Sequence, residues 1–485
     1  MRIEKDSLGE MAVPDEAYYG IQTTRVSHNY LVSDRTYNDY PEMIAAVAEV
    51  KKACAITNAQ IGALDPKKSE AIQQACDEMI AGRFAGQFPV NIWRSQGTGV
   101  NMNVNEVLAN RANEILTGHK GYDQVHPNSH VNMCQSSNDV FPTVEAIVLH
   151  RRVKRVCDAL KRLEKEIAKK ALEFESTIRL GRTGLQDAVP MTYGQVFGGW
   201  QSQLRRNRVS FEEFRNTFEE GVLGATVLGT GMGQLPGYAD HIYENLSKII
   251  GFEMHLAQMP GDEVIPDSAV FDGMRNTDHQ LILMEHLSAI TTAMGRIAND
   301  LLLYSSGPRT GLCELYLSEL DDELKGYYGT SSTYVPELVM EVMQQVVATE
   351  QMAMFAANEG QLDHGSINSG GIICVLDALT MVEDVIDVFA QKCIAGITVN
   401  VERCRKNAEL STSLSTMVSS LYGYPTGVKI AKLAIAENIS CKEAALKEHL
   451  LPEDAAEELF DVKKLTDRHA MVEMFHKYGK LRKIS

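Results

Sequence analysis

Proline is absent from four long stretches of this chain, and this absence constrains the fold more than any other feature. The stretches lie between Pro142 and Pro190, Pro190 and Pro236, Pro266 and Pro308, and Pro336 and Pro425. Proline is excluded from helix interiors because it has no amide hydrogen and its ring clashes with the preceding turn. These stretches therefore leave room for very long helices.

One of the stretches carries an apolar stripe with a helical period. Its members are spaced alternately four and three residues apart: Leu283, Leu287, Ile290, Met294, Ile297 and Leu301. This spacing is typical of the seam of a left-handed helix bundle. We interpret the stripe as core packing and not as a ligand site. Helices of this length usually need partners from other subunits, so we expect a homo-oligomer.

Composition and charge exclude several functional classes. The chain has 485 residues and a formal net charge of −17, which argues against nucleic acid and membrane surfaces as partners. A small anionic substrate remains compatible, because a local pocket can be positive. The nine scattered cysteines contain no CxxC pair, which favours a reduced, cytoplasmic protein without a zinc site. The N-terminus has no apolar signal segment.

Changes in the helical pattern predict three domains. Residues 1–142 begin with a polar, turn-rich segment and continue with a helix from Glu42 to about Ala63. Residues 143–395 contain most of the long proline-free stretches and form the predicted central helix bundle. Residues 396–485 break into shorter helical segments, which predict a small helical C-terminal domain. The expected fold class is mostly α.

The segment from Gly307 to Glu337 interrupts the helical pattern. Its second half is rich in glycine, serine and tyrosine and has no apolar periodicity, so we expect a loop. A helix should restart at Pro336, since proline suits the first helical turn. Long ordered loops often carry function. We therefore expect this loop to lie over an active site.

Three polar clusters lie between the helical segments: residues 97–99 (GTG), 135–138 (QSSN) and 182–187 (RTGLQD). Serine, threonine and asparagine at helix ends are usually caps, and each cluster alone fits that interpretation. Together the clusters supply neutral hydrogen-bond donors, which suit a carboxylate. Both interpretations remain open from the residues alone.

Longer runs around these clusters resemble the aspartase/fumarase superfamily, and the resemblance extends over essentially the whole chain. The aspartate ammonia-lyase-like branch is the most similar. The matching runs are residues 13–23 (VPDEAYYGIQT), 101–107 (NMNVNEV), 135–143 (QSSNDVFPT), 185–192 (LQDAVPMT) and 306–311 (SGPRTG).

The resemblance implies three mostly α domains, with five long helices per subunit joining into the core of a homotetramer. Each active site would be built from three subunits. The implied reaction is a β-elimination: a base removes a proton next to an activating carboxylate, and an amine or water leaves the adjacent carbon. The resemblance implies no cofactor and no metal. It places these residues in the substrate pocket: Thr98, Ser136, Ser137, Asn138, Thr183 and Gln186.

The chain departs from the family pattern where the general base is expected. Members of the family carry a mobile loop, GSSxMPxKxNP, whose serine is the base and whose lysine and asparagine clamp a substrate carboxylate. Counted without gaps, the base position here holds Leu324 or Lys325, and the clamp positions hold Thr330 and Ser332. Gly184 replaces a common histidine, whose usual glutamate partner matches Glu337.

Three interpretations follow. The first is an active carbon–nitrogen lyase whose substrate keeps one carboxylate, because a second one would lack a counter-charge. Its leaving group would be a bulky cationic amine, attracted by Glu337 and by the aromatic faces of Tyr327, Tyr328 and Tyr334. A betaine such as ergothioneine fits, since the family member ergothionase releases trimethylamine from it. Simple loop packing explains the tyrosines equally well.

The second interpretation is an aspartate ammonia-lyase with a slipped base loop, in which Gly329–Ser332 replaces the usual turn. The third is a catalytically inactive structural homologue, which the intact serine-rich run argues against. In the active interpretations the general base comes from the loop. A tyrosine or lysine base would need a pKa lowered by burial or a nearby cation. The candidates are Lys325, Tyr327, Tyr328, Ser331 and Ser332.

Overall fold

A computed structural model describes residues 1–29, 32–93, 96–258, 261, 264–318, 320, 328–360, 362–365 and 369–482. Helices dominate this part of the chain, and its strands pair only into two-stranded sheets, so the predicted mostly α fold is confirmed. The chain divides into two compact units. Unit 1 comprises residues 1–157, 209–289 and 344–382, and unit 2 comprises residues 158–208, 290–343 and 383–485. The three-domain boundaries at residues 142 and 395 stay a prediction.

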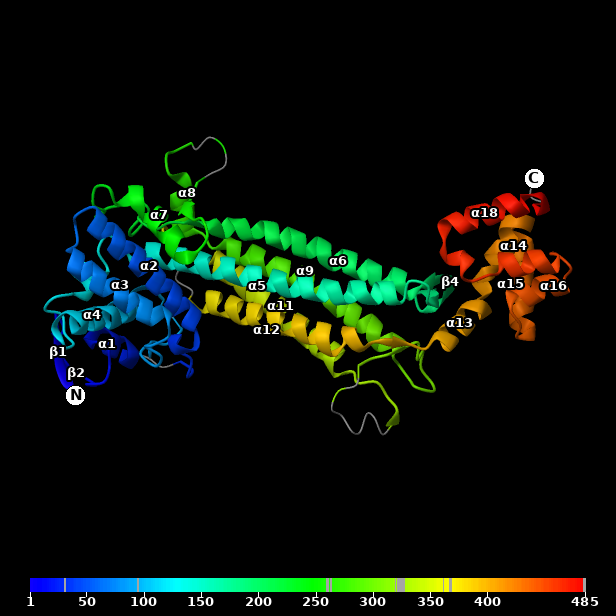
Figure 1. Ribbon diagram of the computed structural model, residues 1–485, viewed down its shortest axis with the longest axis horizontal. Helices are drawn as coiled ribbons and strands as arrows, with labels where there is room; N and C mark the ends of the chain where they lie inside the picture. Colours follow the sequence, from blue (N-terminus) through cyan, green and yellow to red (C-terminus); the bar gives the residue numbers. More distant parts are fainter. Residues whose placement is uncertain are drawn as a thin grey trace. The chain divides into compact units, whose positions relative to one another are not determined.

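Five long helices of the described chain each contribute residues to both units (Figure 1). Each occupies one of the proline-poor stretches, and the prolines that they contain, Pro142 and Pro336, lie near helix N-termini. The apolar stripe from Leu283 to Leu301 is fully buried, as predicted. The bounds are α5 (Ser137–Glu173), α6 (Tyr193–Phe214), α9 (Asp278–Tyr304), α11 (Tyr334–Asn358) and α12 (Ser369–Lys392).

Unit 1 contains the N-terminal elements and two short helices from the middle of the chain. Proline starts two of its helices, and Asp65 caps the second by accepting from the amides of Lys67 and Lys68. The predicted helix at residues 42–63 matches α2. The elements are β1 (Arg2–Asp6), β2 (Gly9–Val13), α1 (Ile21–Asn29), α2 (Pro41–Gln60), α3 (Pro66–Ile80), α4 (Asn101–Thr117), β5 (Glu220–Gly221), α7 (Tyr238–Ile250), β6 (His255–Leu256) and α8 (Ser268–Arg275).

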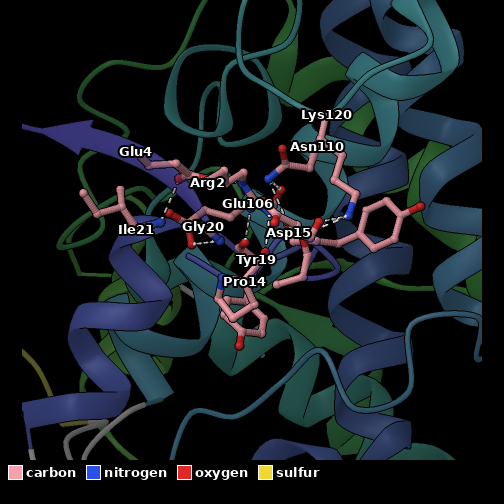
Figure 2. A network of polar contacts seen from close by, with 12 residues as sticks. Arg2, Glu4, Pro14, Asp15, Tyr19, Gly20, Ile21, Glu106, Asn110 and Lys120 are labelled. Atoms are coloured by element: carbon pink, nitrogen blue, oxygen red, sulfur yellow. Dashed lines mark hydrogen bonds and ion pairs between the residues drawn. The ribbon is translucent and has the colours of Figure 1, made fainter. Parts of the chain in front are cut away.

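A buried carboxylate explains much of the run from Val13 to Thr23. Glu106 on α4 accepts a hydrogen bond from the Gly20 amide, directly before α1, at 2.9 Å (Figure 2). It also accepts from the Thr23 amide in the first turn of α1 at 3.1 Å. A negative side chain is favourable there because the first amides of a helix have no internal partner. A side chain at position 20 would clash, since a Cβ would lie 2.9 Å from a Glu106 oxygen. These contacts give the end of the run from Val13 to Thr23 a structural role.

Unit 2 contains a β-hairpin, a second short sheet and the C-terminal helices. The C-terminal helices pack around an apolar core that includes Leu414, Val418, Leu421 and Ile430, and they confirm the short helical segments predicted there. The last helix, α18, was not predicted. The elements are β3 (Ile178–Thr183), β4 (Gln186–Thr192), β7 (Leu315–Tyr316), β8 (Thr398–Val399), α13 (Val401–Leu410), α14 (Ser415–Tyr422), α15 (Tyr424–Glu437), α16 (Cys441–Lys447), α17 (Glu453–Leu459) and α18 (Arg468–Tyr478).

One local expectation is confirmed and another needs correction. Residues 182–187 lie at a break between the long helices α5 and α6, as expected, and they form the end of the β3–β4 hairpin. Gly184 and Leu185 adopt left-handed conformations, with φ of 56° and 64°, which is the turn geometry that matches the twist of two strands. Helix α11 begins at Tyr334, two residues before the predicted start. Among the described helices, none is long and apolar enough to cross a membrane.

Candidate active site

Ser136, Ser137 and Asn138, here called the serine cluster, lie at the N-terminus of α5 in unit 1. The Ser136 hydroxyl accepts from the Asn138 amide at 3.3 Å, and the Asp139 carboxylate accepts from the Ser136 amide at 2.9 Å. Ser136 thus caps the helix N-terminus through the second amide, and Asp139 returns a bond to the Ser136 amide as the third residue of a capping box does. The capping interpretation of Ser136 is therefore right. The Ser136 oxygen is the acceptor in this contact, and its hydrogen donates to no other group of the described residues, so it is available to a ligand.

The Ser137 hydroxyl is arranged in the same way. Its oxygen accepts from the side-chain amide of Asn101 at 3.0 Å, so its hydrogen is also left to donate. The Asn101 amide group further donates to the Asn132 side-chain oxygen at 3.1 Å, and Asn105 donates to that oxygen at 3.2 Å. Ser136 and Ser137 are only half-buried. The cluster thus presents two accessible hydroxyl donors, which is the chemistry that a carboxylate needs.

Lys51 lies beneath this network and was missed by sequence analysis. Its ammonium group is fully buried and donates to Asn132 at 2.9 Å and to Gln135 at 2.8 Å. Burial lowers the pKa of Lys51 to about 8, and burial raises the pKa of the nearby Asp139 carboxyl to about 6. Both groups are charged at neutral pH. Lys51 orients the amides behind the serine cluster and adds positive charge under it.

We expect the Lys51→Met variant to change the pH dependence of stability. The folded-state pKa of Lys51 lies below its ordinary 10.5, so the unfolded chain binds more protons between pH 8 and 10.5. Wild-type stability should therefore rise relative to Lys51→Met across that range, by about 3 kcal/mol. The difference in unfolding free energy between the two proteins, measured by denaturant titration at several pH values, tests this. A difference that does not vary with pH would contradict it.

The spacing of the asparagines was a usable signal. Asn101 and Asn105 are four residues apart, so they lie on one face of α4, and both point their amides at Asn132. Thr98 precedes them in a short π-helical turn, Gln96–Val100. The Thr98 side chain lies outside the described part of the chain.

A loop from residues 222–234 lies against the serine cluster. The Asn138 side chain donates to the Val227 carbonyl at 2.9 Å. The Asp139 carboxylate, which is buried, accepts from the amides of Gly224 and Thr226 at 3.0 and 2.9 Å. These contacts hold the loop beside the N-terminus of α5. No motif in the sequence pointed to this loop.

Thr183 and Gln186 lie at the tip of the β3–β4 hairpin in unit 2, and both are exposed. Arg182 directly precedes Thr183 and pairs with Asp187 next to the turn, and its guanidinium group forms an ion pair with Glu314 at 2.6 Å. This ion pair therefore holds the hairpin close to its tip. In this unit the two side chains are available to a ligand or to another subunit.

Glu314 connects that hairpin to the segment from Gly307 to Glu337, here called the base loop because the general base is expected in it. Its carboxylate is fully buried and also accepts from the Tyr193 hydroxyl at 3.1 Å and the Asn407 amide at 3.2 Å. The chain then forms β7, and the Leu317 amide donates to the Ser331 hydroxyl at 3.3 Å. Glu314 thus holds the segment that carries Thr183 through Arg182, and the chain that follows Glu314 contacts Ser331 through the Leu317 amide.

The candidate bases are described only in part. Lys325 and Tyr327 lie outside the described residues. Tyr328 is exposed, and Glu337 is exposed in the first turn of α11. Ser332 is buried, and its hydroxyl has no hydrogen-bond partner among the described residues. The described ones, Tyr328, Ser332 and Glu337, belong to unit 2, whereas the serine cluster belongs to unit 1. The assignment of the base stays a prediction.

Comparison with known proteins gives consistent results. A protein family described as lyase matches residues 9–322. Aspartate ammonia-lyases from a Bacillus species and from Escherichia coli are 34% and 33% identical, and each match covers 96% of this chain and 97% and 96% of those enzymes.

Solved structures agree with these relatives. A fumarate lyase/delta crystallin from Brucella melitensis has a TM-score of 0.91 at 36% identity, covering 96% of this chain and 99% of the other. A class II fumarase from Schistosoma mansoni has a TM-score of 0.87 at 30% identity, with the same coverage of 96% and 99%.

Proposed function

Because the chain belongs to the aspartase/fumarase superfamily and is a lyase of the ammonia-lyase type, we propose that it eliminates a bulky cationic amine from a substrate with one carboxylate. The serine cluster carries this proposal. The Ser136 and Ser137 oxygens accept hydrogen bonds from the protein, so their hydrogens are left to bind a carboxylate. The same donors would stabilise the additional negative charge that develops on that carboxylate when the adjacent carbon loses a proton.

The base loop supports a substrate other than a dicarboxylate. Thr330 and Ser332 occupy the positions where a lysine and an asparagine would clamp a second carboxylate. Neutral hydroxyls leave such a group without a counter-charge, which is costly in a closed site. Tyr328 and Tyr334 are exposed, and Glu337 follows Tyr334 by three residues, on the same face of α11. Aromatic faces beside a carboxylate suit a trimethylammonium group. A betaine of the ergothioneine type carries one carboxylate and one trimethylammonium group, so it suits these two sets of residues.

A second candidate is aspartate ammonia-lyase activity with a rearranged loop. It is favoured by the relatives that carry that name, and by the Ser331 hydroxyl. This oxygen accepts from the Leu317 amide at 3.3 Å, which fixes a serine at the root of the base loop. In this alternative, Ser331 or Ser332 removes the proton.

We expect the purified protein to release trimethylamine from ergothioneine or another histidine betaine. A mass-spectrometric elimination screen should also contain L-aspartate, fumarate with ammonia, and argininosuccinate. The Ser137→Ala variant should raise KM by about tenfold for any substrate turned over, because it removes one donor to the carboxylate. Turnover of aspartate alone would favour the second candidate. Unchanged kinetics in Ser137→Ala would contradict the proposed carboxylate pocket. The absence of an elimination product from every compound in the screen would contradict both proposed activities.

We further propose that the enzyme is a homotetramer whose active sites are shared between subunits. Helix α11 exposes an apolar face in unit 1, and a face of this kind in one chain is typical of a protein contact. The β3–β4 hairpin also exposes Leu185 and Val189 beside the predicted site residues Thr183 and Gln186. The exposed apolar residues of α11 are Val347, Met352, Met354 and Phe355.

The Phe355→Glu variant should dissociate the assembly and lower activity with it. Phe355 is 62% exposed in one chain, so a charge there disturbs the single subunit little but would be buried in a helix-bundle contact. Light scattering coupled to gel filtration would measure the oligomeric state. Ile435→Glu is the matched control, because Ile435 is 67% exposed on the C-terminal helix α15. A Phe355→Glu protein with the mass of the wild type would contradict the proposed contact.

A further inference from the structure

The loop that holds Asn138 also exposes two apolar side chains next to the serine cluster. We propose that Val227 and Leu228 form an apolar wall of the substrate site and determine the size of the group that the enzyme accepts beside the bound carboxylate. The inference rests on the proposed function, because it takes the serine cluster as the carboxylate site. It adds two specificity-determining residues that lie outside the motifs of the sequence analysis.

Direct hydrogen bonds hold residues 226 and 227 next to the serine cluster. The Val227 carbonyl accepts from the Asn138 side chain at 2.9 Å, so Val227 and the serine cluster are joined by one bond. The Thr226 amide, one residue earlier, donates to Asp139 at 2.9 Å. Asn138 and Asp139 directly follow Ser136 and Ser137 in the chain. The side chains of residues 227 and 228 therefore begin at the edge of the donor cluster.

The loop is internally fixed, as a wall requires. Gly229 and Gly231 both donate to the Ala225 carbonyl, at 3.2 and 3.0 Å, and the Gln234 side chain donates to the Gly224 carbonyl at 2.9 Å. Thr226 has φ of 60°, which a β-branched residue rarely adopts. Such a conformation persists only where the surroundings impose it, and it is concentrated at functional sites.

The pattern of exposure separates this pair from the apolar residues that precede it in the loop. Val222, Leu223 and Ala225 are buried, whereas Val227 and Leu228 are 46% and 40% exposed; Met232, further along the loop, is also exposed. Once the carboxylate is bound, the remaining carbon atoms of a substrate must lie against a neighbouring surface. An apolar surface there buries methylene or N-methyl groups and excludes water, which strengthens the hydrogen bonds of the adjacent hydroxyls.

The test compares binding of straight-chain monocarboxylates to the full-length enzyme and to Leu228→Ala. Acetate reaches only the serine cluster, whereas hexanoate would extend along the wall. Calorimetric titration should show that Leu228→Ala weakens hexanoate binding by about tenfold and acetate binding by less than about twofold. Val227→Ala should act in the same direction. Leu116→Ala is the control, because Leu116 is a leucine of unit 1 with a similar exposure of 38% and lies at the end of α4.

The outcomes separate the wall from the carboxylate site. Suppose that Ser137→Ala abolishes acetate binding while Leu228→Ala leaves the ratio of hexanoate affinity to acetate affinity unchanged. The proposed apolar wall is then contradicted and the proposed carboxylate site is supported. If Ser137→Ala leaves acetate binding unchanged, the carboxylate site itself is wrong. A Leu228→Ala protein of altered oligomeric mass would show that Val227 and Leu228 contact another copy of the chain, and would also contradict the proposed apolar wall. A selective loss of hexanoate binding in Leu228→Ala would support the wall.

Discussion

Replacing Glu314 with glutamine is expected to lower the free energy of unfolding by about 3–5 kcal/mol. The Glu314 carboxylate is fully buried and forms an ion pair with Arg182 at 2.6 Å, and the Arg179 guanidinium group lies 3.9 Å away. Glutamine keeps the shape but removes the charge, so two buried guanidinium groups lose their counter-ion. Arg179 keeps partial compensation, because its cation lies 4.5 Å from the centre of the Tyr304 ring.

The same variant should lower activity beyond its effect on stability. Glu314 holds the segment that carries Thr183 and the segment that leads to Ser331, so both groups of site residues lose their common anchor. Denaturant unfolding and steady-state kinetics at a temperature where the variant is folded would measure the two effects separately. Glu458→Gln is the matched control, since Glu458 also accepts from three side chains (Lys464, Lys477 and Tyr478) but lies at the surface.

A double-mutant cycle distinguishes the ion pair from simple packing. In Glu314→Gln/Arg182→Met one unpaired buried charge is removed together with its partner, so the double variant should lose less stability than the sum of the single variants. Additive losses, or a Glu314→Gln protein as stable as Glu458→Gln, would show that the buried pair does not hold these segments together.

The second large effect is expected from the general base. Under the proposed amine elimination, Tyr327→Phe or Tyr328→Phe should lower kcat by about 10²–10⁴-fold, because proton transfer by a positioned side chain contributes this much. The oligomeric state and the melting temperature of Tyr328→Phe should equal those of the wild type, since Tyr328 is exposed. Under the alternative aspartate elimination, the same loss should occur in Ser331→Ala or Ser332→Ala.

One set of variants therefore identifies both the base and the reaction. The set comprises single replacements of Lys325, Tyr327, Tyr328, Ser331 and Ser332, assayed for kcat on the best substrate of the elimination screen. Tyr334→Phe is the matched control, because it keeps the aromatic face of an exposed tyrosine at the start of α11 and removes only a hydroxyl that is not a candidate base. Full activity in all five variants would place the base outside this loop.

The sequence predicted the parts of this protein that depend on neighbours along the chain. Proline exclusion and a stripe of period 3.5 predicted the long helices, and α9 buries that stripe in full. The match to the aspartase/fumarase superfamily is likewise confirmed, because long ordered motifs are preserved in the chain itself. The capping role of Ser136 was among the local interpretations, since its cap contacts join residues only two and three positions apart.

Tertiary structure decided the surroundings of the site. Lys51 contacts Asn132 across 81 residues, Asn138 contacts Val227 across 89, and Arg182 contacts Glu314 across 132. Nothing in a local pattern specifies such pairs, because each partner alone resembles an ordinary surface lysine, loop carbonyl or helix-flanking glutamate. Only packing brings a buried charge under the serine cluster and an apolar pair beside it. For this reason motifs in the sequence predicted the reaction class, whereas the anchors of the site became visible only in the folded chain.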